Sequence, residues 1–126
     1  MSQRIEINDA TIKNNELLLT ADLEAGIEEM TATGQMLVDS DQLSFIYIVE
    51  KEGGYQYLSI PERIWDIIHD GLQAGLEASL ISGRNKLRLP GFRQEMDYLI
   101  ANITGNSNYG EEMVAKVEQI FAAPSA

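Results

Sequence analysis

The feature that most constrains the fold is a pair of apolar segments joined by a glycine-containing turn. Residues 43–49 and 55–60 are rich in β-branched and aromatic side chains, which favour strands. Between them stands Lys51-Glu52-Gly53-Gly54, where glycine can adopt the positive φ angles that a tight hairpin turn requires. The pattern predicts a β-hairpin over residues 43–60.

Other short apolar segments in the first half of the chain also predict strands. Apolar and polar residues alternate over residues 4–8, as expected for a strand with one buried face. Residues 17–19 and 36–38 are further strand candidates, and the pair Asn14-Asn15 suits a tight turn leading into the first of them. We expect these segments and the central hairpin to form an antiparallel meander.

The second half of the chain predicts helices around a second hairpin. Residues 59–62 have the spacing of a capping box, with proline near the first position of a helix. A hairpin over residues 78–89 follows, then a helix from about residue 90 to Gly105, and a last helix from Glu111. The helix residues expected to be largely buried are Trp65, Leu72, Phe92, Leu99, Ile103, Val117 and Phe121.

Together these segments predict a single α+β domain over residues 1–126. Its strand-rich half covers residues 1–60, and its half of helices and one hairpin covers residues 61–122. The simplest architecture is an antiparallel sheet of five to seven strands packed on one face by about three helices. The chain is 44% hydrophobic, which provides enough apolar material for the core of such a domain.

Composition excludes several function classes. The chain has 20 Asp plus Glu against 9 Lys plus Arg, a formal net charge of −11, which argues against binding nucleic acid or an anionic membrane. It has no cysteine, so disulfides, thiolate zinc sites and iron–sulfur clusters are excluded. No secretory signal is evident, and no apolar run approaches the roughly 20 residues that span a bilayer. We expect a cytoplasmic protein that needs no cofactor.

One acidic pair is a candidate for metal binding or catalysis. Asp39 and Asp41 have the D-x-D spacing that can place two carboxylates near one Mg²⁺ ion, and His69, the only histidine, could supply a base or a third ligand. Asp and Ser are also frequent in turns, where their side chains accept hydrogen bonds from backbone N–H groups. His69 adjoins the apolar stripe of its helix, where a histidine paired with a nearby acid is common.

Basic residues are concentrated in one short region. Four of the nine, Arg84, Lys86, Arg88 and Arg93, lie within ten positions, and Lys86 and Arg88 share one face of a strand. They form a cationic patch for an acidic partner or a carboxylate or phosphate ligand. Alternatively, they protect an edge strand from aggregation or pair with the surplus acids of the chain.

Aromatic residues mark the central hairpin. Phe45 and Tyr47 point to one face of the first strand, and Tyr55 and Tyr57 share a face of the second. Cross-strand pairing of the four would produce an aromatic ladder. If helices cover the other face, this ladder is a surface for a protein partner or for a homodimer; otherwise it is the core.

Three stretches, residues 33–41, 61–65 and 105–112, resemble those of a known protein family in their order and spacing. They read TGQMLVDSD, PERIW and GNSNYGEE. They are similar to an uncharacterised family of short, acidic, cysteine-free proteins from bacilli and related Gram-positive bacteria, and the resemblance covers nearly the whole chain. It implies a cytoplasmic bacterial protein, and it transfers no activity, cofactor or site residue.

The sequence therefore favours a non-enzymatic protein that acts through contacts with another protein, as an adaptor, regulator or subunit, or with a second copy of itself. No catalytic constellation is present, whereas charge is segregated and aromatic residues are paired. The alternative is an enzyme or a small-ligand or Mg²⁺-binding protein that uses Asp39, Asp41 and His69.

Overall fold

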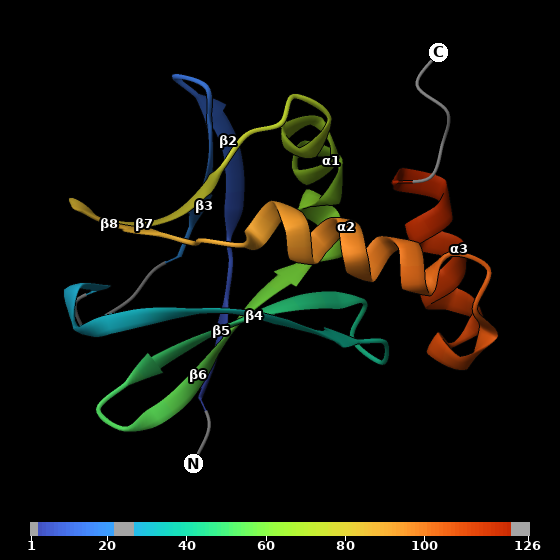
Figure 1. The fold of residues 1–126 in the computed structure, drawn as a ribbon, viewed down its shortest axis with the longest axis horizontal. Coiled ribbons are helices and arrows are strands. Elements are labelled where there is room, and N and C mark those ends of the chain that lie inside the picture. The colour runs from blue at the N-terminus through green and yellow to red at the C-terminus, as the bar shows by residue number, and fades with distance from the viewer. Residues whose placement is uncertain (1–2, 22–26, 122–126) are drawn as a thin grey trace.

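The computed structural model describes residues 3–21 and 27–121 (Figure 1). The strands are β1 (Gln3–Glu6), β2 (Asp9–Lys13), β3 (Glu16–Thr20), β4 (Met30–Asp39), β5 (Ser44–Lys51), β6 (Gly54–Pro61), β7 (Ala78–Ser82) and β8 (Asn85–Arg88). The helices are α1 (Trp65–Gln73), α2 (Phe92–Ile103) and α3 (Glu111–Ile120), with short 3-10 turns η1 (Ile27–Glu29), η2 (Glu62–Ile64) and η3 (Ser107–Tyr109). None of these helices is long and apolar enough to span a membrane.

The α+β class is confirmed, but the strands form two sheets instead of one antiparallel sheet. Sheet A has the order β1-β6-β5-β4, and sheet B has the order β2-β3-β7-β8. Both are mixed, because β1 runs parallel to β6 and β3 runs parallel to β7. The chain passes from sheet A to sheet B between residues 7 and 8. Ile7 N–H donates to the Ser59 carbonyl on β6 (2.8 Å), whereas Asn8 N–H donates to the Thr20 carbonyl on β3 (2.7 Å).

The predicted tight turns are confirmed. Glu52 and Gly53 connect β5 to β6 with φ angles of 53° and 78°, and Asn14 and Asn15 connect β2 to β3 with φ angles of 54° and 61°. Two successive positive φ angles give a two-residue turn whose twist matches that of the flanking strands. Glycine and asparagine adopt this conformation at low cost, so these turns fix the register of both hairpins.

The predicted aromatic ladder is wrong. A two-residue turn pairs odd-numbered residues of one strand with even-numbered residues of the other, so Tyr47 lies opposite Leu58. Phe45 and Tyr47 therefore point into the core and are fully buried, whereas Tyr55 and Tyr57 point to the opposite face of sheet A. Tyr47, predicted as part of a partner-binding face, is a core residue.

The predicted capping box before the first helix does not form. Ser59 belongs to β6, and its hydroxyl accepts a hydrogen bond from Arg4 on the neighbouring strand β1. The chain instead enters α1 through η2, with Pro61 extended (φ −76°, ψ 160°) before it. Pairing between strands takes precedence here over the local helix signal.

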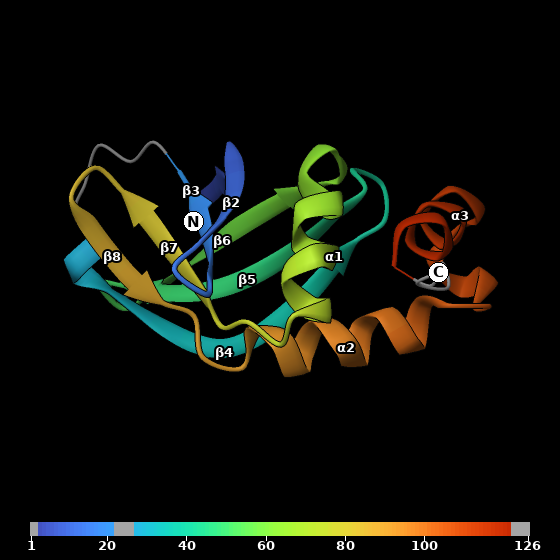
Figure 2. The ribbon, with the colours of Figure 1, turned by 90° about the horizontal axis from the view of Figure 1, so that it is seen from above.

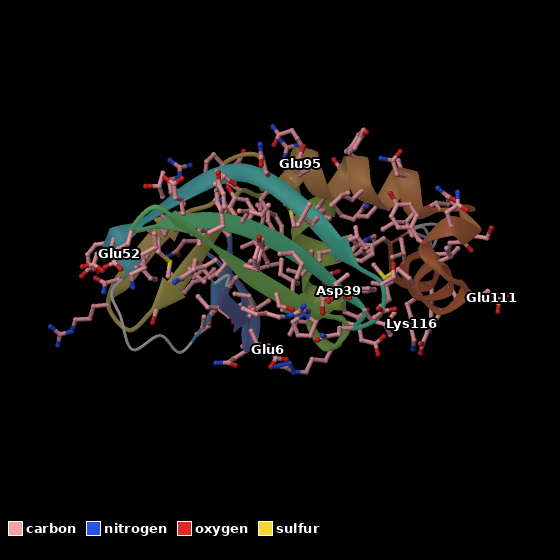
Figure 3. All side chains as sticks on the ribbon, turned by 90° about the horizontal axis from the view of Figure 1, so that it is seen from below. Glu6, Asp39, Glu52, Glu95, Glu111 and Lys116 are labelled. Atoms are coloured by element: carbon pink, nitrogen blue, oxygen red, sulfur yellow. The ribbon has the colours of Figure 1, made fainter. Side chains whose placement is uncertain are left out.

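Sheet B, α1 and α2 all lie on the same side of sheet A (Figures 1 and 2). An aromatic cluster occupies this interior: the ring of Phe45 lies 5.0 Å from that of Trp65 and 5.9 Å from that of Phe121. Of the helix residues predicted to be buried, all are buried except Leu72, which is partly buried. The opposite side of sheet A has no described helix or strand in front of it (Figure 3).

A bulge in β4 lies next to the loop that precedes α2, and one side chain links the two. The register between β4 and β5 shifts between Ala32 and Met36, which marks the bulge. Within this bulge, the hydroxyl of Thr33 donates to the Ile48 carbonyl at 2.7 Å. The buried Tyr47 hydroxyl accepts from Gly34 N–H (3.2 Å) and donates to the Pro90 carbonyl (2.7 Å). One side chain thus satisfies backbone groups of both the bulge and the loop before α2.

Candidate functional site

The outer face of sheet A carries apolar side chains where a solvent-facing sheet surface is normally polar. Register and strand alternation place these residues on the side away from the core. Leu37 pairs with Ile46, Ile48 pairs with Tyr57, and Tyr55 lies two positions from Tyr57 on the same face. We call them the outer strip, and they are Leu37, Ile46, Ile48, Tyr55 and Tyr57. Leu37 is 48% exposed and Tyr55 is 52% exposed.

Part of the outer strip lines a hollow of about 540 Å³. Its lining residues come from all four strands of sheet A and the turn after β4: Arg4, Leu37, Val38, Asp39, Ser40, Asp41, Ile46 and Tyr57. Ile46 is only 5% exposed although it points away from the core. The surrounding side chains therefore form walls around an apolar floor.

An ion pair crosses the sheet at this hollow. Arg4 lies on β1 and Asp39 ends β4, the two edge strands of sheet A, yet Arg4 Nη1 donates to Asp39 Oδ2 at 2.7 Å. Arg4 Nη2 also donates to Ser59 Oγ at 2.9 Å. The hydrogen bond from Arg4 is the main reason why the pKa of the Asp39 carboxyl is lowered, and the Gln42 backbone N–H contributes to the same shift.

The structure brings two of the three predicted acid–base or metal residues to this hollow. Asp39 also accepts a hydrogen bond from Gln42 N–H (3.2 Å), as expected of an Asp in a turn, and Asp41 is exposed nearby. His69 lies instead on α1, on the interior side of sheet A, with its ring 5.9 Å from that of Phe121. Across residues 3–21 and 27–121, no three His, Cys, Asp or Glu side chains group as metal ligands.

The predicted cationic residues lie elsewhere and are partly paired. Lys86 Nζ makes a short ion pair with Glu16 on β3, and Ser79 Oγ donates to the other Glu16 oxygen at 2.5 Å. Lys86, and secondly Ser79, lower the pKa of the Glu16 carboxyl. Arg88 shares the edge strand β8 with Lys86, and Arg84 is in the turn before it.

The fourth predicted basic residue lies on a different element from the other three. Arg93 stands in the first turn of α2, where it is only partly exposed. The four basic residues therefore come from one hairpin and one helix, and at least Lys86 is used within the molecule.

Sequence reasoning missed Arg4, Leu37 and Ile46 as site residues. A signal for the last two was present, because residues 36–38 and 45–49 are apolar at every position instead of at alternate ones. In a sheet with one solvent-facing side, such a run indicates an apolar outer face. Arg4 carried no such signal, since its role depends on which strand pairs with β1.

The family model and the relatives that match this chain agree with each other. A family model described as a family of unknown function, UPF0738, matches residues 5–121. A UPF0738 protein of Bacillus licheniformis is 44% identical over 121 residues, covering 96% of this chain and 99% of the relative. A UPF0738 protein of Bacillus cytotoxicus is 37% identical over 122 residues with the same coverage. The predicted resemblance to a Bacillus family is confirmed, and no solved structure matches significantly.

Proposed function

Since this chain belongs to the UPF0738 family, whose function is unknown, we propose its role from the structure: it acts without catalysis, by binding another protein through the outer face of sheet A. One observation carries the proposal. Leu37 and Tyr55 are each about half exposed on a sheet face that no element among residues 3–21 and 27–121 covers (Figure 3). A contiguous apolar surface on a small domain is typical of an interaction site.

The composition of this face supports a protein partner. Protein interfaces combine an apolar centre, enriched in tyrosine, with a polar rim. The outer strip would supply the centre with two tyrosines, Tyr55 and Tyr57. Exposed acids, Glu6, Asp41 and Glu50, would supply the rim.

Charge favours a different protein over a second copy of this chain. Two copies that each carry a net charge of −11 repel, and facing rims of Glu6, Asp41 and Glu50 would add to that repulsion. A partner with an apolar patch bordered by lysine or arginine would be attracted at long range and would then bury the outer strip. We propose that the two proteins meet in the cytoplasm.

Site-specific photo-crosslinking in living cells tests this proposal. Leu37 and Ile12 are matched positions, 48% and 41% exposed, of which only Leu37 belongs to the outer strip. A crosslinking residue at position 37 should capture one defined protein that position 12 does not capture. With that protein purified, Leu37→Asp should weaken binding about tenfold or more, whereas Ile12→Asp should leave it unchanged. Equal effects at the two positions would refute the proposal.

A second candidate, a small-ligand or Mg²⁺ site with or without catalysis, is favoured by one observation. Asp39 and Asp41 line the same hollow, within reach of one bound ligand. The Arg4 guanidinium competes for Asp39, and His69 is not available on this side of sheet A. Calorimetric titration with Mg²⁺ separates the two functions: binding that is lost in both Asp39→Ala and Asp41→Ala would replace the protein-binding proposal.

A further inference from the structure

We infer that the hollow beside Arg4 and Asp39 receives a basic side chain, arginine above all, from the partner. This inference rests on the proposed function and states which chemistry of the partner the outer face recognises. It is carried by three features of the lining: an apolar floor, an aromatic wall and a carboxylate without a partner among the described residues.

The floor and wall match the shape of an arginine side chain. Leu37 and Ile46 offer aliphatic surface for its methylene groups, which are as apolar as those of leucine. Tyr57 lines the same hollow and offers a ring on which a planar guanidinium can stack. The volume of about 540 Å³ leaves room for one long side chain together with the neighbouring residue of the partner.

The charges of the hollow favour a cation. Arg4 and Asp39 neutralise each other, because they are joined by the 2.7 Å ion pair. Among the described residues, Asp41 has neither a hydrogen bond nor an ion pair to its carboxylate, so it gives the lining one uncompensated negative charge. An acidic or neutral side chain would leave this charge unpaired, whereas an arginine can pair with it through two parallel hydrogen bonds.

The aromatic wall and the free carboxylate together set the expected strength. An exposed ion pair and an exposed cation–π contact each contribute little to the free energy of binding. Added together, the two contributions correspond to about three- to tenfold in affinity. This gain concerns the charged group alone, and apolar contacts with Leu37 and Ile46 are common to charged and uncharged ligands of the same shape.

The test uses the full chain labelled with nitrogen-15 and two blocked tripeptides, acetyl-Leu-Arg-Leu-amide and the same peptide with citrulline in place of arginine. Citrulline keeps the shape of arginine and removes its charge. The arginine peptide should shift the backbone amide signals of residues 37–41, 46 and 57, and it should bind about three- to tenfold more tightly than the citrulline peptide.

Matched variants assign the effect to the hollow. Asp41→Asn should reduce the preference for arginine, because only the contact with the Tyr57 ring would then distinguish the two peptides, whereas Asp97→Asn, an exposed acid on α2, should leave the preference unchanged. The amide spectrum of each variant also reports whether it is folded.

Two results would overturn the inference. Equal affinity of both peptides for the hollow would show that it accepts apolar segments regardless of charge, and the proposed function would stand. Absence of shifts at these residues at about 10 mM peptide, well above the millimolar affinity expected of such weak contacts, would remove the hollow as an arginine site. The crosslinking comparison of positions 37 and 12 would then decide the proposed function by itself.

Discussion

Arg4 and Asp39 lie on opposite edge strands of sheet A and meet over its outer face, 35 positions apart in sequence, at 2.7 Å. Between these strands, the sheet presents Ser59 beneath the guanidinium, a small residue that is 3% exposed. The two charged side chains are 36% and 25% exposed, so the pair stabilises the fold by only about 0.2–1 kcal/mol. Its larger consequence is geometric, since it bounds the hollow in which Asp41 and Tyr57 lie.

Replacing Asp39 by asparagine tests this pair through its pH dependence. The amide side chain would keep an oxygen acceptor for Gln42 N–H but would lose the charge that attracts Arg4. At pH 7 the variant should be less stable by about 0.2–1 kcal/mol. Because the pKa of Asp39 is lowered in the folded state, its contribution is present above the unfolded value of 3.8 and is lost as pH falls through the folded value.

Urea denaturation at pH 7 and at about pH 2.5 measures this difference. The gap between wild type and Asp39→Asn should be about 0.2–1 kcal/mol at the higher pH and should narrow at the lower one. Asp97→Asn, on the exposed side of α2, provides the control and should show no such change. A gap of unchanged size at both pH values would contradict the assignment of the stabilisation to the charged pair.

The sequence predicted most of the local elements, with the exception of β2 (Asp9–Lys13), but not which strands pair with one another. Asn14-Asn15 and Gly53 identified their turns because positive φ angles favour asparagine and glycine. Whether β1 pairs with β6 or with β2 depends on the change of sheet at Ile7 and Asn8, where no residue type signals a bend. The alternation of apolar and polar side chains indicates which face of a strand is buried. It does not indicate which strand lies beside it.

The site was predictable only in part for the same reason. Asp39 and Asp41 were found because they are two positions apart after a strand, so local geometry alone brings them together. Arg4 was missed because its contact with Asp39 requires two further strands, β6 and β5, in the correct order. Tyr57 was selected, but on the face assigned to Tyr47, because the odd-to-even pairing of a two-residue turn was overlooked.

Tyr47→Phe should destabilise the protein by about 1–2 kcal/mol, because the substitution retains the buried ring and removes the hydroxyl. Gly34 N–H and the Pro90 carbonyl then both lose their partner. Thermal or urea denaturation measures the loss. Tyr98→Phe, at a tyrosine that is 63% exposed, is the matched control and should change stability by less than about 0.5 kcal/mol.

Hydrogen exchange distinguishes this explanation from a general loss of packing. In Tyr47→Phe the amide of Gly34 should exchange faster relative to amides of α1, because its specific acceptor is gone. Uniformly faster exchange across the chain would contradict the proposed role of the hydroxyl.

Gly71→Ala should destabilise the protein although alanine is the better helix former. In an exposed helix the change would stabilise by about 1 kcal/mol. Gly71 instead faces Leu17 on β3, and an added Cβ would lie 3.1 Å from Leu17 Cδ2 and 3.3 Å from Cδ1. Leu17 is fully buried and has little room to move, so overpacking should outweigh the propensity and cost about 1–2 kcal/mol net.

A double-mutant cycle identifies the cause of that loss. Leu17→Val removes both Cδ atoms that the new Cβ would meet, so Gly71→Ala should cost less in the Leu17→Val background than in the wild type. Denaturation of the four proteins gives the coupling free energy. Additive effects of the two substitutions would contradict a direct clash between these residues.

Gly91→Ala should be more damaging than Gly83→Ala, although both glycines have positive φ angles of 77° and 59°. The shared backbone conformation disfavours a Cβ by about 1–2 kcal/mol at either position. At Gly83 nothing lies within 4 Å of the added atom, whereas at Gly91 it would lie 3.4 Å from the Gly34 carbonyl oxygen in the β4 bulge. Urea denaturation should show a larger loss for Gly91→Ala, accompanied by faster exchange of the Gly34 amide. Equal losses would mean that the 3.4 Å contact with the Gly34 carbonyl oxygen carries no strain.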